Sequence, residues 1–424
     1  MRAIKIGLFG FGCVGQGLYQ TINNSKNFEG EIVKICVKDR HKTRSLPEGI
    51  FTYNKEEILN DPSIDVIVEL IDNAEAALEI VTTALKNGKS VVTANKKMVA
   101  ENLEYLIDLQ QKTGKGILYE GAVCGSIPII RTLEEYFGHE PLNEIKGIFN
   151  GSTNYILTKI FDDRLDYAQA LEEAKEKGFA ESDPTLDVKG FDPKFKLSIL
   201  LTHAFGINVS PEKIANLGID HLQPSDLEFA RKHGYRIKLI AQASRKNDEV
   251  FACVLPQFIK ENHNLRNVNN EFNAVTLNGE FCDDQLFIGK GAGSLPTGAA
   301  VLSDISALSY DYKYEYKKHY NQGKVHFSSE NAVTVYVSFE KPEHIDLNEF
   351  EAVSEKFFCF DRSYVIGKIK LSKLLQSKWV YNSKISVVQF DNDTEISEEL
   401  DLSALETEIL ELRKGQKLRE KISV

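Results

Sequence analysis

The chain has 424 residues, a formal net charge of −11 at pH 7, 42% hydrophobic residues and 27% charged residues. This length is enough for two or three domains with large cores, and the negative charge argues against non-specific binding to nucleic acid or to anionic membranes. No apolar run is long enough to span a bilayer, and the N-terminal residues lack the apolar core of a signal peptide. The six cysteines are spread out without a CxxC pair, as in reduced cytosolic proteins. We therefore expect a cytoplasmic protein.

The first motif is a glycine pattern that directly follows a short apolar stretch. Residues 4–9 predict a buried strand, Gly10, Gly12 and Gly15 follow it, and a helical pattern continues to Ile22. In such a unit the first glycine permits a tight turn, the second lets the backbone approach a pyrophosphate, and the third lets the helix pack on the strand. The helix N-terminus also favours the phosphate charge. The pattern predicts a dinucleotide site, and Val14 lies in the same loop.

The end of the next predicted strand, residues 31–37, bears on the choice between NAD and NADP. An acidic residue at this place binds the ribose 2′-hydroxyl of NAD, whereas basic residues accept the 2′-phosphate of NADP. Asp39 supports NAD, while Lys38 and Arg40 support NADP. We expect NADP in preference to NAD, and a solvated loop is the alternative.

Strands and helices then alternate at short intervals. The predicted elements are strands at 65–70, 90–93 and 116–119 and an alanine-rich helix at 74–85. This alternation predicts an α/β fold with a parallel, doubly wound sheet. Ligands bind at the carboxyl ends of such strands, which is where Thr93, Asn95 and Lys96 fall. Lys96 is therefore a functional candidate, with an exposed residue at a helix start as the alternative.

A loop of small residues, 120–128, follows the last strand of this unit. Such a loop can bring several backbone carbonyls together, as a monovalent cation requires, and it can equally be a tight connection. Cys124 in this loop invites interpretation as a nucleophile, but no histidine lies near it in the sequence. We expect a structural role for Cys124.

The remainder predicts two further domains. Residues 144–150 form a predicted strand, and Asn150-Gly-Ser-Thr-Asn154 begins a helix whose amides suit a cofactor phosphate or a substrate carboxylate, unless Ser152 or Thr153 simply caps it. Further predicted elements are helices at 156–161 and 167–177, strands at 236–244, 250–259 and 274–277, and a glycine-rich loop at 289–300 that leads into a helix ending at 308. The tail predicts strands at 332–339, 364–371 and 384–390, helices at 347–355 and 402–412, and a basic, solvated end at 413–421.

These elements predict three domains. We expect a Rossmann domain at 1–140, to which residues 291–310 return with Gly291 lining the cofactor. An α+β catalytic and dimerisation domain with a mostly antiparallel sheet is expected at 141–290, and a small α+β domain at 325–424.

Charged residues concentrate in the stretch from Gly178 to Lys196. Its carboxylates are Glu181, Asp183, Asp187 and Asp192, and its lysines are Lys189, Lys194 and Lys196. Asp192 and Pro193 are expected to be the N-cap and first residue of a helix, which places Lys196 on the same face as Asp192. Carboxylates that hold an ammonium beside a lysine at a reacting oxygen suit a small amino-acid substrate. A salt-bridged turn before a core helix is the alternative.

Taken in order, these motifs resemble those of homoserine dehydrogenases over about residues 1–310. They are Gly10-x-Gly12-x-x-Gly15, Thr93-Ala-Asn95-Lys96, Asn150-Gly-Ser-Thr-Asn-Tyr155, the stretch from Gly178 to Lys196, and Gly291 to Ile305. The resemblance implies reversible, NAD- or NADP-dependent interconversion of L-homoserine and L-aspartate 4-semialdehyde in threonine and methionine biosynthesis. It also implies a homodimer or homotetramer, here of the monofunctional form because no aspartokinase domain precedes the glycine pattern.

The resemblance assigns roles by position. Lys196 and Lys96 would act at the reacting oxygen, Glu181 and Asp187 would bind the amino end of the substrate with Gly178 nearby, and Asp192 would hydrogen-bond near the reacting group. A sodium ion would be held by the loop through Glu120, Val123, Gly125 and Ile127. Lys290 and Pro193-Lys194 depart from the family pattern. The tail lacks the glycine pattern of a regulatory ACT domain, so a degenerate ACT-like module and a dimerisation element both fit it.

Two rival functions follow from the same residues. A semialdehyde dehydrogenase would use Cys124 as its nucleophile and would need a histidine partner. A non-catalytic, nucleotide-sensing protein is also compatible with the fold, because fold alone does not give function.

Overall fold

The computed structural model describes residues 3–321, 323–359 and 362–391. The chain forms two compact units, and each is built from three segments. The first unit comprises Met1–Ile145, Phe195–Pro211 and Phe272–Val325, and the second comprises Lys146–Lys194, Glu212–Glu271 and His326–Val424. None of the helices in the described ranges is long and apolar enough to cross a membrane.

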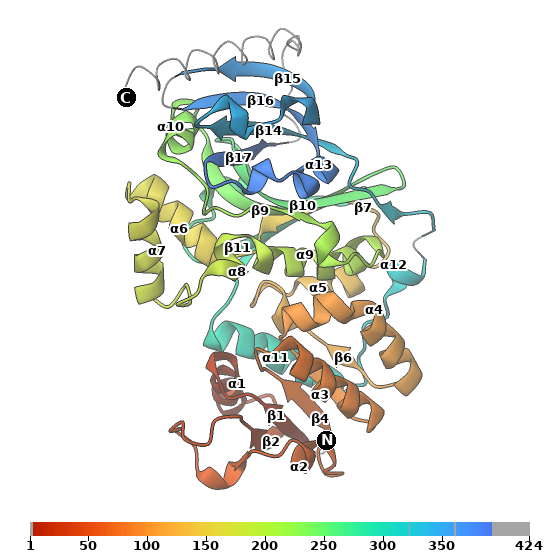
Figure 1. Ribbon diagram of the computed structural model, residues 1–424. Coiled ribbons are helices and arrows are strands. Elements are labelled where there is room, and N and C mark those ends of the chain that lie inside the picture. Colours follow the sequence, from red (N-terminus) through yellow and green to blue (C-terminus); the bar gives the residue numbers. More distant parts are fainter. Residues whose placement is uncertain (1–2, 322, 360–361, 392–424) are drawn as a thin grey trace. The chain divides into compact units, whose positions relative to one another are not determined.

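A six-stranded parallel sheet lies in the first unit (Figure 1). Its strand order is β3-β2-β1-β4-β5-β6. The strands are β1 (Ile4–Phe9), β2 (Gly30–Cys36), β3 (Phe51–Thr52), β4 (Val66–Glu69), β5 (Ser90–Thr93) and β6 (Ile117–Leu118). The chain reverses its direction of travel across the sheet between β1 and β4, which is where doubly wound sheets bind ligands. The predicted parallel, doubly wound sheet is confirmed.

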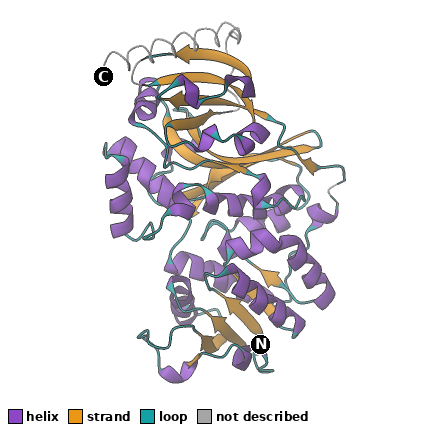
Figure 2. Ribbon diagram, in the orientation of Figure 1, coloured by secondary structure: helices purple, strands orange, loops and turns teal. Residues whose placement is uncertain are grey.

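Helices accompany this sheet, as Figure 2 shows in purple. They are α1 (Cys13–Asn24), α2 (Glu56–Leu59), α3 (Ala74–Lys86), α4 (Lys96–Thr113), α5 (Ile129–Arg131), α11 (Ser294–Leu308) and α12 (Lys317–Tyr320), with short helical turns at η1 (Glu48–Ile50), η2 (Glu120–Ala122) and η3 (Thr132–Tyr136). The helix α3 illustrates why they form: Ala77, Val81 and Ala84 recur at helical spacing and are fully buried. Its N-cap is Asn73, which accepts a hydrogen bond from the Ala76 amide.

The helix α11 packs against α1, far away in the sequence (Figure 1). A Cβ atom on Gly298 would lie 2.6 Å from the carbonyl carbon of Gly17, so the two backbones approach as only glycines allow. Val301 and Ile305 of α11 are fully buried in the same apolar core as Ile6 of β1. The first unit also contains the antiparallel hairpin of β11 (Phe272–Gly279) and β12 (Asp283–Lys290).

The second unit contains a mixed, mostly antiparallel sheet in the order β9-β10-β17-β14-β16-β15. Its strands are β9 (Arg236–Lys246), β10 (Glu249–Ile259), β14 (Ala332–Phe339), β15 (Phe350–Phe357), β16 (Ser363–Lys370) and β17 (Ile385–Phe390), and the two-residue strands β8 (Ala215–Asn216) and β13 (His326–Phe327) pair with β10. The predicted antiparallel character is confirmed. Strand β7 (Leu142–Ile148) begins in the first unit and ends in the second.

The helices of the second unit are grouped before β9 and after β16. They are α6 (Gly151–Asp162), α7 (Tyr167–Glu176), α8 (Thr185–Val188), α10 (Pro224–Lys232) and α13 (Leu371–Gln376), with short turns at η4 (Pro211–Lys213), η5 (Asn264–Asn267), η6 (Pro342–His344), η7 (Leu347–Glu349) and η8 (Trp379–Tyr381). Helix α9 (Phe191–Phe205) crosses the boundary between the units within its own length.

Two sequence predictions about these elements are wrong. Residues 347–355 are not a helix, because only a single 3₁₀ turn forms there before strand β15, which pairs with β16. Asp192 is not the N-cap of α9, because the helix begins at Phe191 and Asp192 lies in its first turn. The predicted helix at 402–412 and basic end at 413–421 lie outside the described residues.

Candidate active site

The three glycines after β1 have the geometry that a bound pyrophosphate requires. Gly10 has φ +92°, and a Cβ there would lie 2.5 Å from the Leu70 carbonyl oxygen. A Cβ on Gly15 would lie 2.6 Å from the Gly10 carbonyl oxygen, whereas one on Gly12 would have open space around it. Gly12 is also the N-cap of α1, and as a glycine it has no side chain to cap that helix start. The space beside Gly12 is open, and the half-buried Val14 lies in the first turn of the helix.

The loop after β2 carries charges of both signs. Lys38, Asp39 and Arg40 are all exposed. The Arg40 guanidinium lies 4.8 Å from the ring centroid of Tyr53. The Asp39 carboxylate accepts a hydrogen bond of 2.8 Å from the His41 amide, and this bond lowers its pKa. Both an acidic and two basic side chains thus lie where the adenine ribose is expected.

A buried hydrogen-bonded group joins the carboxyl ends of β4 and β5. Thr93 donates to the Glu69 carboxyl over 2.5 Å, and the Ile71 amide donates to it over 2.7 Å. Burial raises the pKa of Glu69 to about 7 despite these donors. Asn95 donates to the Ile71 carbonyl and caps α4 by accepting from the Met98 amide. Sequence reasoning missed Glu69, which only its place at a strand end could have indicated.

Lys96 follows as the first residue of α4 and is half-buried. Two of the residues predicted to contact the cofactor, Thr93 and Asn95, therefore also fix the backbone from which this lysine projects.

The loop of small residues after β6 is held by its first residue. The Glu120 carboxylate accepts hydrogen bonds of 2.8 Å from the amides of Ile130 and Arg131, at the start of α5. The Glu120 amide donates to the Asp304 carboxyl of α11 over 2.8 Å. Burial raises the pKa of Glu120 to about 7 and that of Asp304 well above its ordinary value, and the charge of Glu120 raises the pKa of Asp304 further.

The middle of this loop turns sharply. Cys124 and Gly125 have φ values of +53° and +54°, and a Cβ on Gly125 would lie within 2.7 Å of the carbonyl oxygens of Lys290 and Gly291. The Ser126 amide donates to the Lys290 carbonyl over 3.0 Å. Cys124 is fully buried, which does not suit an attacking nucleophile.

The carbonyls of residues 290 and 291 thus lie close to Gly125, in the loop that contains Glu120, Val123 and Ile127, and Val123 and Ile127 are themselves buried. In the ranges described, no group of three or more histidine, cysteine or acidic side chains could hold a metal ion. The Glu120 side chain is engaged with α5, so an ion here would be held by backbone oxygens. That donor set suits a monovalent cation better than a transition metal.

The second unit brings two carboxylates of the predicted substrate site to one side chain, that of Asn150. The Asn150 side-chain nitrogen donates to the carboxylates of Asp187 over 2.7 Å and Asp192 over 2.9 Å. The Asn150 oxygen meanwhile caps α6 by accepting from the Thr153 amide over 2.8 Å. Asp192 is 4% exposed and Asp187 is half-buried. One amide therefore fixes two carboxylates.

The remaining predicted substrate residues flank this group in the sequence. Gly178, with φ +73°, ends the turn after α7, and Glu181 is exposed three residues later. Lys196 lies in α9, four residues after Asp192, and is 6% exposed. Residues four apart share a helix face, so Asp192 and Lys196 project from the same side of α9.

Comparison with known proteins places these features in a family. Residues 128–306 match the family model described as homoserine dehydrogenase, and residues 10–120 match the model of its NAD-binding domain. A homoserine dehydrogenase of Bacillus subtilis is 38% identical over 317 residues, which cover 73% of each chain. One of Synechocystis is 32% identical over 84% of this chain and 82% of its own.

Solved structures of homoserine dehydrogenases are also similar to this chain. A homoserine dehydrogenase of Thiobacillus denitrificans superposes with a TM-score of 0.81 at 29% identity, over 92% of this chain and 99% of its own. A hyperthermophilic archaeal homoserine dehydrogenase in complex with NADPH gives a TM-score of 0.64 at 26% identity, over 74% of this chain and 99% of its own.

Proposed function

This chain belongs to the homoserine dehydrogenase family, and from this we infer that it interconverts L-homoserine and L-aspartate 4-semialdehyde, a step of threonine and methionine biosynthesis. It is an NAD(P)-dependent oxidoreductase. The structural observation that carries the proposal is the Asn150 amide bound to Asp187 and Asp192, with Lys196 on the same face of α9 as Asp192. The family matches do not favour a cysteine-dependent semialdehyde dehydrogenase or a nucleotide sensor.

The dinucleotide is proposed to bind at the start of α1. Gly10, Gly12, Val14 and Gly15 would approach the pyrophosphate, because Gly12 leaves open space at the start of α1, where helix amides favour a phosphate. We propose NADP in preference to NAD, with Lys38 and Arg40 accepting the 2′-phosphate, and the NADPH complex of the archaeal relative is in keeping with this. Thr93, Asn95 and Gly291 complete the proposed cofactor site. When bound, the nicotinamide accepts or supplies the hydride.

The substrate is proposed to bind with its charged amino end at the carboxylates. Glu181 and Asp187 would hold the ammonium, beside the turn at Gly178. Asp192, fixed by Asn150, would accept a hydrogen bond near the reacting group. Lys196 and Lys96 would face the reacting oxygen, where a positive charge stabilises the alkoxide that develops as the aldehyde is reduced. The proton then passes between the oxygen and one of the two ammonium groups.

A sodium ion is proposed in the loop after β6. The residues named by the family motif are Glu120, Val123, Gly125 and Ile127. The successive left-handed residues Cys124 and Gly125, and the close approach of the Gly125 backbone to the carbonyls of residues 290 and 291, support this proposal, because they bring backbone oxygens near the loop. A bound ion would fix the loop rather than take part in proton transfer.

At the level of the whole chain we propose a cytoplasmic homodimer or homotetramer. Residues 1–140 and 291–310 would form the nucleotide-binding domain, residues 141–290 the substrate domain, and residues 325–424 a further domain of ACT-like or dimerising character.

The proposal is tested by following nicotinamide absorbance with L-homoserine and either NAD or NADP, in sodium and in potassium buffers. We expect reduction of both cofactors, with the higher kcat/KM for NADP. Arg40→Ala should lower kcat/KM for NADP while leaving that for NAD within about twofold, since it removes only a proposed 2′-phosphate contact. An enzyme that reduces neither cofactor would contradict the proposed function, and a preference for NAD would contradict only the cofactor assignment.

A further inference from the structure

A buried histidine of α9 joins three segments that are far apart in the sequence. The His203 Nδ1 atom lies 2.6 Å from the Glu134 carboxylate, and its Nε2 atom lies 2.9 Å from the hydroxyl of Tyr119. The Tyr119 hydroxyl in turn lies 2.9 Å from that of Tyr316. We call these four residues the His203 network. Tyr119, His203 and Tyr316 are at most 2% exposed, and the Glu134 side chain is 6% exposed.

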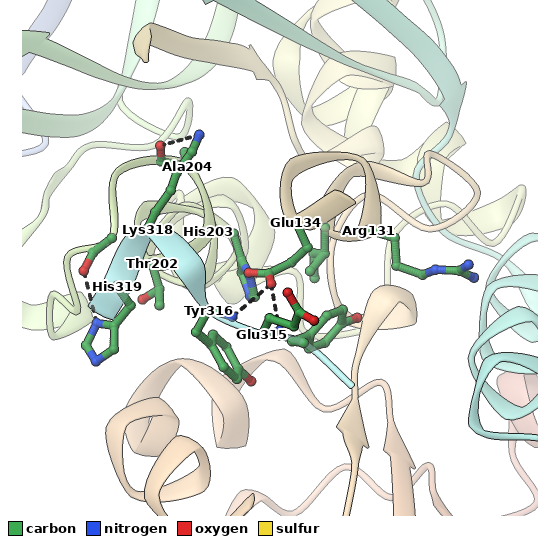
Figure 3. Close-up of polar contacts among 12 residues, drawn as sticks. Arg131, Glu134, Thr202, His203, Ala204, Glu315, Tyr316, Lys318 and His319 are labelled. Atoms are coloured by element: carbon green, nitrogen blue, oxygen red, sulfur yellow. Dashed lines mark hydrogen bonds and ion pairs between the residues drawn. The ribbon is translucent and has the colours of Figure 1, made fainter. Parts of the chain in front are cut away.

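The protonation of the His203 network follows from its neighbours. Burial raises the pKa of Glu134, but the hydrogen bond and charge of His203 and the amides of Tyr316 and Glu315 outweigh it, so this pKa lies below its ordinary value. Glu134 is therefore a carboxylate that accepts from His203 Nδ1 and from both amides, as Figure 3 shows. Burial raises the pKa of Tyr119 well above its ordinary value, so its hydroxyl keeps its proton and shares a hydrogen bond of 2.9 Å with Nε2.

The two partners of His203 flank the proposed sodium loop. Tyr119 is the residue immediately before Glu120. Glu134 lies in the helical turn η3, which directly continues α5, and the first amides of α5 bind the Glu120 carboxylate. The imidazole of His203 is therefore hydrogen-bonded to residues on both sides of the loop.

His203 also shares a helix face with the proposed catalytic residues. It lies seven residues after Lys196 and eleven after Asp192, spacings that return to the same side of an α-helix. The end of this helix is fixed as well: Lys318 donates to the Ala204 carbonyl over 3.1 Å, and His319 Nδ1 lies 3.0 Å from the Gly206 carbonyl (Figure 3). Rotation of α9 about its axis would break the bonds of His203 and would turn Lys196 away from its site.

From this geometry we propose that His203 is a positioning residue that couples the sodium loop to Lys196. Ion binding orders the loop, the loop fixes Tyr119 and Glu134, and these hold His203 and the orientation of α9. This inference rests on the proposed function, because it takes the loop as the ion site and Lys196 as the reacting lysine.

The test is Tyr119→Phe, which removes only the hydroxyl that contacts His203 and keeps the ring. The matched control is Tyr336→Phe, since Tyr336 is also only 2% exposed, lies in β14 of the second unit and packs on Phe229 at a centroid distance of 4.6 Å. His203→Asn serves as a second variant, because its amide can still donate to Glu134 at the place of Nδ1 but cannot reach Tyr119.

Two readouts are measured against sodium at constant ionic strength, with choline as the replacement cation: the melting temperature without substrate or cofactor, and kcat for L-homoserine. In Tyr119→Phe and His203→Asn we expect the sodium concentration at the midpoint of each response to rise by about threefold to tenfold. A change of this size corresponds to the loss of one buried hydrogen bond. Tyr336→Phe should keep the wild-type sodium midpoint even where its melting temperature is lower.

Variants that melt at lower temperature but keep the wild-type sodium midpoint in both readouts would overturn the coupling and leave the proposed function intact. A wild-type enzyme that turns over homoserine with no response to sodium would overturn the ion site and the coupling together. A wild-type enzyme that does not turn over homoserine would contradict the proposed function itself.

Discussion

The side-chain nitrogen of Asn150 donates to the Asp192 carboxylate at 2.9 Å, while the oxygen of the same side chain caps helix α6. The residue that begins one helix thus orients an acidic group in the first turn of another, and it also binds Asp187. Two carboxylates of the proposed substrate site are therefore held by a helix cap.

Asn150→Ala should raise the KM for L-homoserine by about tenfold to a hundredfold, because hydrogen bonds to charged groups contribute about 1.5–3 kcal/mol. The lost cap should also lower the free energy of unfolding by about 1 kcal/mol. Steady-state kinetics and chemical denaturation measure the two effects. Asp166→Ala is the matched control, since Asp166 caps α7 in the same unit through Gln169. It should lower stability alone, and an equal rise in KM in both variants would show that Asn150 acts only as a cap.

Gly12→Ala should weaken cofactor binding without destabilising the fold. A Cβ on Gly12 meets no protein atom within 4 Å, and the residue has an extended conformation with φ −83° that alanine adopts readily. The added methyl group would lie where the pyrophosphate is expected. We therefore predict that the dissociation constant for NADP increases at least tenfold, which corresponds to about 1.4 kcal/mol. Gly49→Ala, also in open space, is the control. Unchanged NADP affinity in a fluorescence titration would contradict the assignment.

Gly298→Ala should destabilise the first unit by about 1–3 kcal/mol, because its Cβ would lie 2.6 Å from backbone atoms of Gly17 and Leu18. Ser306→Ala, exposed on the same helix, should change the free energy of unfolding by less than about 0.5 kcal/mol. Thermal and urea unfolding distinguish the two variants. If both unfold as the wild type does, the close contact of α1 and α11 is absent in solution.

The buried Glu69 should make stability depend on pH. Its pKa is raised from 4.5 to about 7 by burial, so the folded state retains a proton that the unfolded state releases. The stability that this proton confers is complete below about pH 4.5 and is lost as the pH rises to about 7. Glu69→Gln keeps a neutral group there at every pH. The free energy of unfolding of this variant minus that of the wild type should therefore be larger at pH 8 than at pH 5, by about 1–3 kcal/mol.

Urea unfolding at several pH values measures this difference. Glu31→Gln, which replaces an exposed carboxyl on β2, is measured alongside it as the control. If the difference in free energy of unfolding between Glu69→Gln and the wild type does not change with pH, then Glu69 titrates in the folded protein as it does in the unfolded chain.

The parts of the fold that sequence reasoning predicted are those specified by local pattern. The strand before Gly10, the helix after it and the alternation through β5 depend on short apolar runs and on glycine, and all are confirmed. The helix expected at 347–355 failed for the opposite reason. Leu347, Phe350 and Val353 recur at helical spacing, but the pairing of β15 with β16 decides the conformation, and that pairing is not visible in the local pattern.

The candidate site likewise has residues that the sequence made visible and residues that it did not. The motif residues from Gly178 to Lys196 were visible as a dense run of charge, and the roles of Lys196, Lys96 and Glu181 stay predictions. Glu69, Asp304 and the His203 network were not visible, because each acquires its character from burial and from partners far along the chain. Tyr119 and His203 are 84 residues apart, and neither belongs to a recognisable spacing. Such contacts arise only when the sheet and helices have formed.

The most direct test of the central claim is the rate of nicotinamide reduction by L-homoserine in Lys196→Ala, with NADP affinity measured separately by titration. Lys194→Ala is the control, because Lys194 is also buried in α9 but binds Asn216 and has no proposed catalytic role. We predict that Lys196→Ala lowers kcat by at least about a hundredfold with NADP affinity unchanged, the size of effect that proton transfer by a positioned side chain supplies, and that Lys194→Ala stays within about threefold of the wild type. A Lys196→Ala enzyme that retains the wild-type kcat would contradict the account.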